Sequence, residues 1–335
     1  MRLILLSMVL VGRMCTPSRA GECPRRQEGT RLLRSADGRL IVEVIDPSNP
    51  PPQYHYRDRF TPSAFVTQAA FDGKAFVYAN ILHEDQSFLG GMPTEYDICE
   101  RTLPPGYTEA AEGEPFVKIG VGRLRKDDET YRFIKDYPDV EKPVTEVSWR
   151  DDGATFRQTL AESAQGYAYA LETDLQIEGN RLIHTTKLTN TGEKPFTTDQ
   201  YLHNFLRFSD RDLGPDYMLV FPFDIALGDK LNQPQPKTNP AFVQSGPRTL
   251  TFADPSSEIP LSGKAYIFDP AGEGRSFSVK HRETGQRLTI ESSKPFFNMG
   301  LWITDFQLSP EANVLLEVAP GETDVLVRTY TFENG

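Results

Sequence analysis

A histidine among aromatic residues is the first candidate for chemistry in this sequence. His203 lies in the run 197–205, between Tyr201 and Phe205. An imidazole exchanges protons near neutral pH, and a sugar ring could stack on the neighbouring aromatic side chains. Just upstream, the Asn-Thr-Gly and Pro-Phe of residues 190–196 predict a strand that ends in a tight turn. On its own, His203 also fits a core histidine that is hydrogen-bonded to a neighbour.

A carboxylate inside an apolar strand is the second candidate. Glu317 interrupts the apolar run 314–318. A buried carboxylate costs free energy unless it faces a partner or a cleft. Burial in a cleft would raise the pKa of Glu317 toward the range in which a carboxylate acts as a general base. The alternative is that Glu317 faces solvent on an edge strand.

Four further residues could bind a substrate. Arg123 and Arg125 share one face if they lie on a strand, and together they could grip a carboxylate or a phosphate. The alternative is a solvated basic face whose charge balances that of the acidic residues 127–129. His83 lies in a polar loop that could reach the rim of a cleft. Trp302 could stack on a pyranose ring, although a core tryptophan is the ordinary alternative.

The elements that must position these residues are strands. Segments 144–149 and 154–160 flank an Asp-Gly turn, and segments 169–177 and 181–189 flank a Gly-Asn turn, so both pairs are predicted hairpins. No apolar stripe at helical spacing lasts three turns, so we expect little helix. Many strands with regular turns and no βαβ rhythm predict an all-β fold, a large antiparallel sandwich.

Composition limits the class of protein. The chain has 335 residues, of which 38% are hydrophobic and 25% charged, as is typical of a globular protein with a large core. The formal net charge is −11. Nucleic-acid binding needs a concentrated basic face, so we do not expect that partner. We predict a single domain over residues 40–335, preceded by an N-terminal arm at 21–39.

The first twenty residues are similar to a signal peptide. Arg2 precedes an apolar run over residues 3–12, and residues 18–20 (Ser-Arg-Ala) offer small side chains to a signal peptidase. The run is too short to cross a bilayer. We therefore expect a secreted or periplasmic protein without a membrane span; the alternative is a misassigned start codon.

Two cysteines would remain after cleavage of residues 1–20. Cys23 and Cys99 could form one disulfide or stay as two thiols. The sequence has no CxxC spacing and no cluster of cysteines and histidines, so we expect no structural metal site.

Several short motifs occur in an order that resembles one enzyme family. Residues 190–205 contain Asn-Thr-Gly, Pro-Phe and Leu-His-Asn-Phe, and residues 320–332 contain Pro-Gly-Glu and Arg-Thr-Tyr-Thr-Phe. Between these motifs lie Trp302 and the strand of Glu317. Over residues 180–335 this order resembles the aldose 1-epimerases, or galactose mutarotase-like proteins, and in particular their hexose-phosphate mutarotase branch.

The resemblance implies a β-supersandwich with a shallow sugar cleft on its concave sheet. It also implies a reaction that interconverts the α and β anomers of a free aldose, without a cofactor. An acid protonates the ring oxygen while a base removes the proton of the anomeric hydroxyl, and the ring opens and closes again. By position, His203 would be the acid and Glu317 the base, roles that suit an imidazole and a carboxylate whose pKa is raised by burial.

Two features of the resembled family are missing. Its usual His-Gly-Phe histidine is absent from residues 116–126, and an aspartate that commonly binds sugar hydroxyls is absent from residues 262–266. The sugar could therefore differ from an ordinary hexose and could be acidic. We predict an isomerase that acts on a carbohydrate. The alternative is a carbohydrate-binding protein that kept the sandwich and lost catalysis.

Overall fold

A computed structural model describes most of the chain. The described residues are 26–51, 59–77, 90–98, 101–161, 165–230, 233–234, 241–254 and 263–335. The predicted signal peptide, Cys23, His83 and Cys99 lie outside them. Among the described residues the only helix is the short 3-10 turn η1 (Phe208–Asp210). No helix in this part of the chain is both long and apolar enough to cross a membrane.

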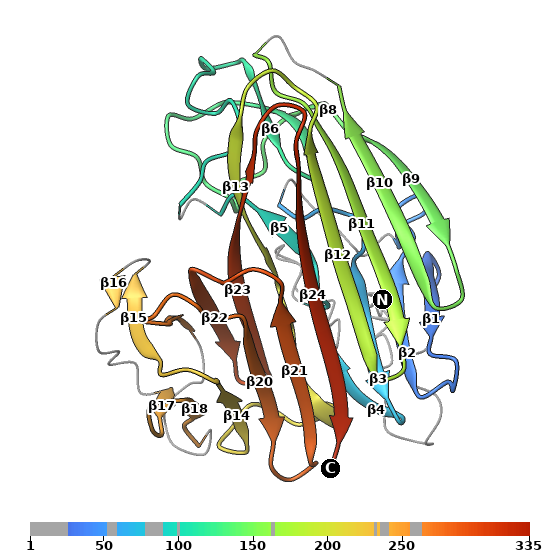
Figure 1. Cartoon of the computed structure of the whole chain (residues 1–335), viewed down its shortest axis with the longest axis vertical. Helices are drawn as coiled ribbons and strands as arrows, with labels where there is room; N and C mark the ends of the chain where they lie inside the picture. Colours follow the sequence, from blue (N-terminus) through green and yellow to red (C-terminus); the bar gives the residue numbers. More distant parts are fainter. Residues whose placement is uncertain are drawn as a thin grey trace, which may run out of the picture.

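The largest sheet has ten antiparallel strands and runs the length of the molecule (Figure 1). In spatial order these are β17 (Phe242–Gln244), β18 (Thr249–Phe252), β14 (Tyr217–Val220), β20 (Ser276–His281), β21 (Gln286–Ser292), β24 (Thr323–Asn334), β12 (Arg181–Asn190), β11 (Tyr169–Glu178), β10 (Gly153–Leu160) and β9 (Val144–Trp149). β9 pairs with β10, and β11 with β12, which confirms the two predicted hairpins.

The second large sheet has seven strands. In spatial order these are β16 (Gln233–Pro234), β15 (Ala226–Lys230), β19 (Gly263–Phe268), β22 (Asn298–Thr304), β23 (Gln307–Val318), β13 (Phe196–Leu202) and β5 (Thr94–Tyr96). Successive side chains of a strand point to opposite faces of its sheet. Along β23, Leu308, Val314 and Leu316 join the core, whereas Ser309 and Glu311 point to the other face. We call that second face of the seven-stranded sheet the polar face.

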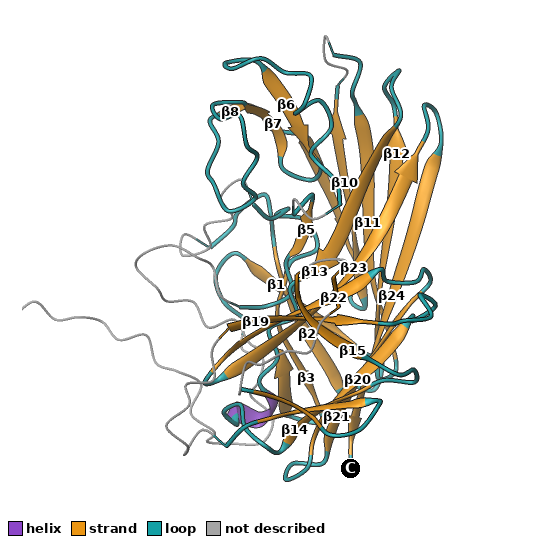
Figure 2. Ribbon diagram, turned by 90° about the vertical axis from the view of Figure 1, so that its left-hand side faces the viewer, coloured by secondary structure: helices purple, strands orange, loops and turns teal. Residues whose placement is uncertain are grey.

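Two small sheets complete the fold. The first contains β1 (Thr30–Arg34), β2 (Leu40–Ile45), β3 (Val66–Phe71) and β4 (Lys74–Val77), so the segment expected as an arm contributes β1. The second contains β6 (Pro115–Lys118), β7 (Gly122–Arg125) and β8 (Asp139–Glu141). β6 to β8 lie at one end of the molecule (Figure 2). They pack on a separate aromatic cluster that includes Tyr107, Phe116 and Tyr131.

One hydrophobic core holds the large sheets together. Its buried side chains come from strands along nearly the whole chain, from Leu33 in β1 to Phe332 in β24. The ten-stranded sheet lies along one side of the molecule in Figure 2, with the seven-stranded sheet packed inside it. This arrangement confirms the predicted all-β, antiparallel sandwich.

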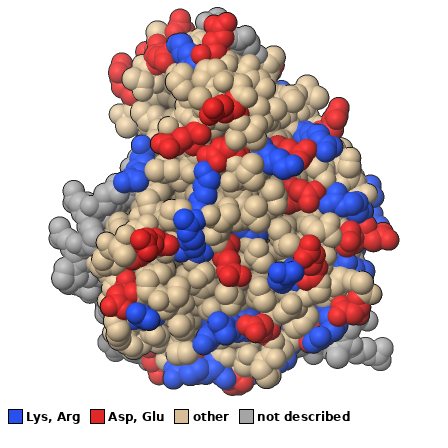
Figure 3. Space-filling model, in the orientation of Figure 1, with Lys and Arg blue, Asp and Glu red and all other residues tan. Residues whose placement is uncertain are grey.

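The outer surface of the ten-stranded sheet carries charges of both signs. Glu172 on β11 accepts hydrogen bonds from Arg157 on β10, at 2.9 Å, and from Lys187 on β12, at 3.0 Å. Figure 3 shows positive and negative side chains interspersed in this way over the face that it draws. Exposed pairs of this kind add little to stability. They do leave this face without a broad area of one sign.

Candidate functional site

His203 is held on the polar face by hydrogen bonds to both of its ring nitrogens. It lies one residue beyond β13, and its backbone N–H donates to the carbonyl of Pro93 at 2.9 Å. Its Nδ1 is 2.6 Å from Ser309 Oγ, and its Nε2 is 3.1 Å from Glu311 Oε1. The side chains of all three residues are buried. β23 therefore supplies both partners of the imidazole.

The register of the sheet explains why Glu311 meets His203. β13 pairs with β23 from Phe196 opposite Val318 to Gln200 opposite Val314. The same register, continued three residues further, places His203 opposite Glu311. On the other side of β23, Gly300 of β22 lies opposite Glu311, and a Cβ atom at Gly300 would come within 2.9 Å of Glu311 Oε2. The glycine leaves the space that the carboxylate occupies.

Glu317 does not meet His203. It lies on the same face of β23 as Glu311, six residues further along, which corresponds to about 20 Å at the rise of a β-strand. It faces solvent beside Thr197 of β13. The expected pair of His203 with Glu317 is therefore corrected by the structure: the carboxylate beside the imidazole is Glu311.

Aromatic rings surround His203. Phe205 stacks on the imidazole, with ring centroids 4.1 Å apart and planes at 6°. Phe60, Tyr201 and Trp302 approach it at centroid distances of 6.1, 5.8 and 6.1 Å. Trp302 of β22 is half-buried, so part of its indole remains accessible. The structure thus brings two of the predicted site residues, His203 and Trp302, together on the polar face.

The imidazole of His203 is held in its neutral form. Burial, and then the positive charges of Arg59 and Lys264, lower the pKa of His203 well below its ordinary value of 6.5. A neutral imidazole has one donor and one acceptor nitrogen, and a carboxylate only accepts. Nε2–H therefore donates to Glu311, and Nδ1 accepts from the hydroxyl of Ser309. Lys264 Nζ lies 4.0 Å from the second oxygen of Glu311.

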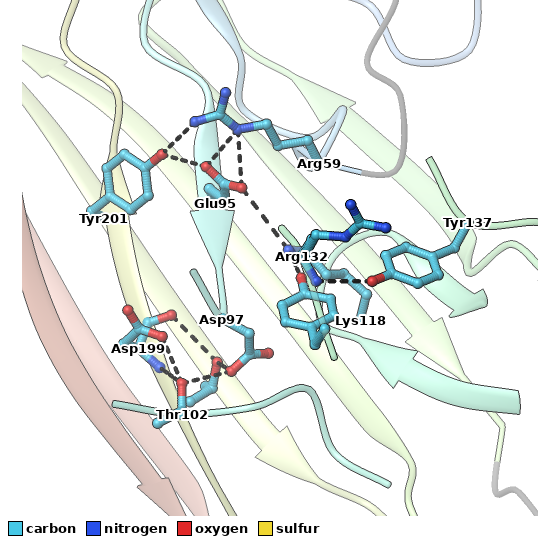
Figure 4. Close-up of polar contacts among 11 residues, drawn as sticks. Arg59, Glu95, Asp97, Thr102, Lys118, Arg132, Tyr137, Asp199 and Tyr201 are labelled. Carbon is cyan, nitrogen blue, oxygen red and sulfur yellow. Dashed lines mark hydrogen bonds and ion pairs between the residues drawn. The ribbon is translucent and has the colours of Figure 1, made fainter. Parts of the chain in front are cut away.

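A second polar network, drawn in Figure 4, includes Tyr201, whose ring centroid lies 5.8 Å from that of His203. Arg59 Nε is 2.9 and 3.1 Å from the two oxygens of Glu95, and Arg59 Nη2 donates to the hydroxyl of Tyr201 at 3.1 Å. The Tyr201 hydroxyl donates in turn to Glu95. Lys118 Nζ lies 3.9 Å from Glu95, and it donates to the hydroxyl of Tyr131. The side chain of Arg59 is 21% exposed, so the network presents one guanidinium to the surface beside the imidazole.

The two arginines that were expected to grip an anion do not share a site. Arg123 of β7 is buried, pairs with Glu141 of β8 and donates to the carbonyl of Ala161 at 2.7 Å. Arg125 is exposed and donates to the carbonyl of Gly113 at 3.3 Å. Both belong to the three-stranded sheet, where their guanidinium groups bind different parts of the protein. The expected pair of anion-binding arginines is therefore corrected, and Arg59 is the arginine that lies beside His203.

The described residues contain no group of three or more histidine, cysteine, aspartate and glutamate side chains arranged to hold a metal ion. The polar face instead brings together a neutral imidazole, a buried carboxylate, two flanking cations and several aromatic rings. An imidazole that is hydrogen-bonded to a carboxylate is suited to proton transfer, and aromatic rings are suited to stacking on another ring.

Comparisons of sequence find no relative: no family model matches the chain, and no curated protein matches it. Comparisons of structure do find similar folds. A galactose mutarotase-like protein from Lactobacillus casei ATCC 334 is 11% identical, with a TM-score of 0.59 over 91% of this chain and 100% of its own. The Slr1438 protein of Synechocystis sp. PCC 6803 is 15% identical, with a TM-score of 0.56 over 96% of this chain and 100% of its own.

A GalM/aldose epimerase homologue from C. elegans is also similar. It is 11% identical, with a TM-score of 0.53 over 91% of this chain and 99% of its own. Identities this low show the fold alone. The predicted galactose mutarotase-like fold is confirmed by these structures.

Proposed function

Starting from the galactose mutarotase-like fold, we propose that this chain interconverts the anomers of a sugar, with His203 and Glu311 as its proton-transfer pair. The observation that carries the proposal is the contact of 3.1 Å between His203 Nε2 and Glu311 Oε1 on the polar face. The names of the similar Lactobacillus casei and C. elegans proteins refer to galactose mutarotase and aldose epimerase. Those names describe the neighbours, and experiment has to establish the activity of this chain.

In the proposed reaction, two protons move at the sugar ring. Glu311 takes the proton of the anomeric hydroxyl, and in the same concerted step His203 Nε2–H gives its proton to the ring oxygen and receives one from Glu311, so that the imidazole stays neutral and Glu311 stays ionised. The bond between the anomeric carbon and the ring oxygen breaks, and an open-chain carbonyl forms. Rotation followed by the reverse transfers closes the ring on the other face. The Nε2 and Oε1 atoms lie within hydrogen-bond distance of each other, so the proton on Glu311 can return to His203 directly.

The electrostatics of the pair require the two transfers to be coupled. Burial and the neighbouring cations keep His203 neutral, and a neutral imidazole is too weak an acid to protonate an ether oxygen first. The negative charge that develops at the anomeric oxygen as Glu311 removes its proton makes the ring oxygen easier to protonate. The hydrogen bond from Ser309 to Nδ1 orients the imidazole during this exchange.

The groups beside the pair would bind the sugar. Trp302 offers a half-exposed ring on which a pyranose can stack. Arg59, which is 21% exposed and binds Glu95 of β5, and Lys264 of β19, which is 33% exposed, both lie near His203. Two cations next to a sugar site favour substrates that carry an acidic group. We therefore propose a carbohydrate substrate, with sugar acids and sugar phosphates tested beside neutral aldoses.

The test follows anomer interconversion by polarimetry or NMR exchange over a panel of neutral and acidic aldoses. His203→Asn and Glu311→Gln should each slow the catalysed rate by about 10²- to 10⁴-fold, the usual contribution of a general acid or base. Glu317→Gln is the matched control, because Glu317 lies on the same face of β23 but faces solvent; its rate should equal that of the unchanged protein.

Two results would decide against the proposed reaction. Equal rates for Glu311→Gln and Glu317→Gln would remove Glu311 from the chemistry. Sugar binding without any acceleration of exchange by the unchanged protein would instead support the carbohydrate-binding alternative.

A further inference from the structure

Two buried carboxyl groups meet at one hydroxyl on the polar face. Asp97, one residue beyond β5, and Asp199 of β13 are both fully buried. The Thr102 Oγ1 atom lies 2.8 Å from Asp97 Oδ1 and 2.6 Å from Asp199 Oδ1 (Figure 4). It also accepts a hydrogen bond from the backbone N–H of Asp199 at 3.1 Å. We call Asp97, Thr102 and Asp199 the acid clamp.

The number of hydrogens in the acid clamp requires one protonated carboxyl. A threonine hydroxyl donates one hydrogen and accepts up to two. Thr102 accepts from the Asp199 backbone and can donate to only one carboxylate. The contact with the other carboxyl is a hydrogen bond only if that carboxyl carries the hydrogen. This count holds whichever aspartate is protonated.

The surroundings favour retention of the proton. Burial, and then the neighbouring Asp199, raise the pKa of Asp97 to about 7, and burial likewise raises the pKa of Asp199. The positive charge of Lys118 of β6 acts in the opposite direction and lowers the pKa of both aspartates. The second carboxyl oxygen of each aspartate is buried without a hydrogen-bond partner in the described part of the chain.

Within the described part of the chain, few other titratable groups lie near the acid clamp. Tyr96 of β5 is fully buried, and its pKa is raised to about 12, chiefly by burial, so it stays neutral up to that range. Glu95 of β5 binds Arg59 and Tyr201. The hydroxyl of Thr198 of β13, which does not titrate, donates a hydrogen bond to Asp97 at 2.9 Å. Of the described groups at this position, the proton shared by the two aspartates is therefore the one that titrates near neutral pH.

The acid clamp fastens a segment that borders the polar face. Arg101, next to Thr102, places its guanidinium 4.8 Å from the centre of the Phe297 ring. Both residues line a pocket of about 240 Å³ together with Leu315 of β23. Leu315 lies four residues from Glu311 on the same face, so the wall formed by Arg101 stands about 13 Å along the strand from the His203 pair.

We propose that the acid clamp is a pH-sensitive latch, in which one shared proton holds segment 101–102 on the sheet. Loss of that proton releases the segment, and with it Arg101, which forms one wall of the pocket. A second negative charge on buried, adjacent carboxyl groups repels the first and removes the hydrogen that one contact needs. Thr102 then has two acceptors for its single hydrogen. The segment is closed in mildly acidic solution and opens as the pH rises above neutrality. This inference does not depend on the proposed sugar chemistry.

The test is limited cleavage by trypsin after Arg101, with the fragment identified by mass spectrometry. Rates are compared between about pH 6 and pH 9 and divided by the rate on a short peptide substrate, which removes the enzyme's own pH profile. Above about pH 7 the corrected rate should rise by up to tenfold per pH unit, because each unit shifts the proton equilibrium tenfold. Asp199→Asn, whose amide donates permanently to Thr102, should keep the rate low and flat. Asp152→Asn, in an exposed turn, is the control and should behave as the unchanged protein.

A second measurement needs no variant. Aspartate carboxyl carbons labelled with ¹³C in the unchanged protein should show one group that titrates near pH 7, far above the ordinary range of aspartate. The latch is overturned if every aspartate signal titrates below about pH 5, or if cleavage after Arg101 has the same pH dependence in Asp199→Asn as in the unchanged protein.

Discussion

The His203 pair and the acid clamp lie on the same polar face, yet burial has opposite consequences for them. Burial, and then the cations Arg59 and Lys264, lower the pKa of His203; burial, and then the neighbouring Asp199, raise the pKa of Asp97. In both cases burial favours the uncharged form, and the chemical type of the group sets the direction of the shift. One buried face can therefore take up a charge in acid at one position and in base at another, only a few residues away.

The largest effect should come from the acid clamp. Asp97 holds its proton up to about pH 7 in the folded protein, whereas in the unfolded chain it releases it near its ordinary pKa of 3.8. Between these two pKa values the folded state binds more protons than the unfolded chain. The contribution of Asp97 to the free energy of unfolding therefore falls as the pH rises, by about 4 kcal/mol in total. Asp97→Asn should remove this fall. Its backbone φ of 54° suits asparagine.

Urea unfolding at a series of pH values, followed by circular dichroism, measures the free energy for Asp97→Asn. The exposed Asp152→Asn variant is again the control. If the free energy of unfolding has the same slope against pH in Asp97→Asn and in the control between about pH 4 and pH 8, the raised pKa of Asp97 does not contribute to the stability of the protein.

His203 should act in the opposite direction. Below about pH 6.5 the unfolded chain binds a proton that folded His203 does not, so stability from this group is lost as the pH falls. His184 behaves in the same way, because burial and then Arg328 lower its pKa to about 3. The difference in the free energy of unfolding between the unchanged protein and His203→Asn, measured by urea unfolding at acid pH, gives the contribution of His203. A difference that is constant from about pH 4 to pH 8 would contradict a neutral imidazole.

Gly300→Ala should disturb the pair without altering any charge. The new Cβ atom would lie 2.9 Å from Glu311 Oε2 and push the carboxylate away from its place. Overpacking of this kind costs about 1–3 kcal/mol of unfolding free energy. The ¹⁵N resonance of His203 Nε2 should shift as its hydrogen bond to Glu311 lengthens. An unchanged resonance would show that the glycine does not control the position of Glu311.

Ser309→Ala should give the smallest effect. It removes the hydroxyl that donates to Nδ1 and leaves a buried acceptor unpaired, at a cost of about 1 kcal/mol, the lower end of the cost of losing such a partner. If the proposed reaction is correct, anomer exchange should slow less than in Glu311→Gln, because Ser309 only orients the imidazole. Polarimetry on both variants makes the comparison. Equal losses would mean that Ser309 has a more direct part in proton transfer.

The sequence was sufficient for the fold because its signals are local. The hairpins β9–β10 and β11–β12 follow from turn residues and alternation within about 20 residues, and the structure confirms them. His203 was visible as a histidine among aromatic residues. The signal peptide stays a prediction, because it lies outside the described residues.

The partner of His203 could not be found in this way. Glu311 and Glu317 lie on the same face of β23, and only the register between β13 and β23 decides which of them meets the imidazole. That register joins segments more than 100 residues apart. Glu317 was conspicuous because it interrupts an apolar run, whereas Glu311 follows Pro310 and stands in no such run. A signal was present in Gly300, since a glycine inside a strand often marks a close approach.

The network of Arg59 with Glu95 and Tyr201 was missed for a similar reason. Its members come from three separate segments, and neither Arg59 nor Glu95 stands in a recognisable motif. Arg123 and Arg125 attracted attention because they are close in sequence. Their side chains nevertheless bind separate groups: Arg123 pairs with Glu141 on β8, and Arg125 donates to the carbonyl of Gly113.

The position of Trp302 gives the molecule an internal optical reporter. The chain has two tryptophans, and the second, Trp149, packs edge-on against Phe156 in the ten-stranded sheet. A Trp149→Phe change would leave one indole emitter, in ring contact with the imidazole. Excited at a wavelength that tyrosine does not absorb, its fluorescence would then report on events at that imidazole.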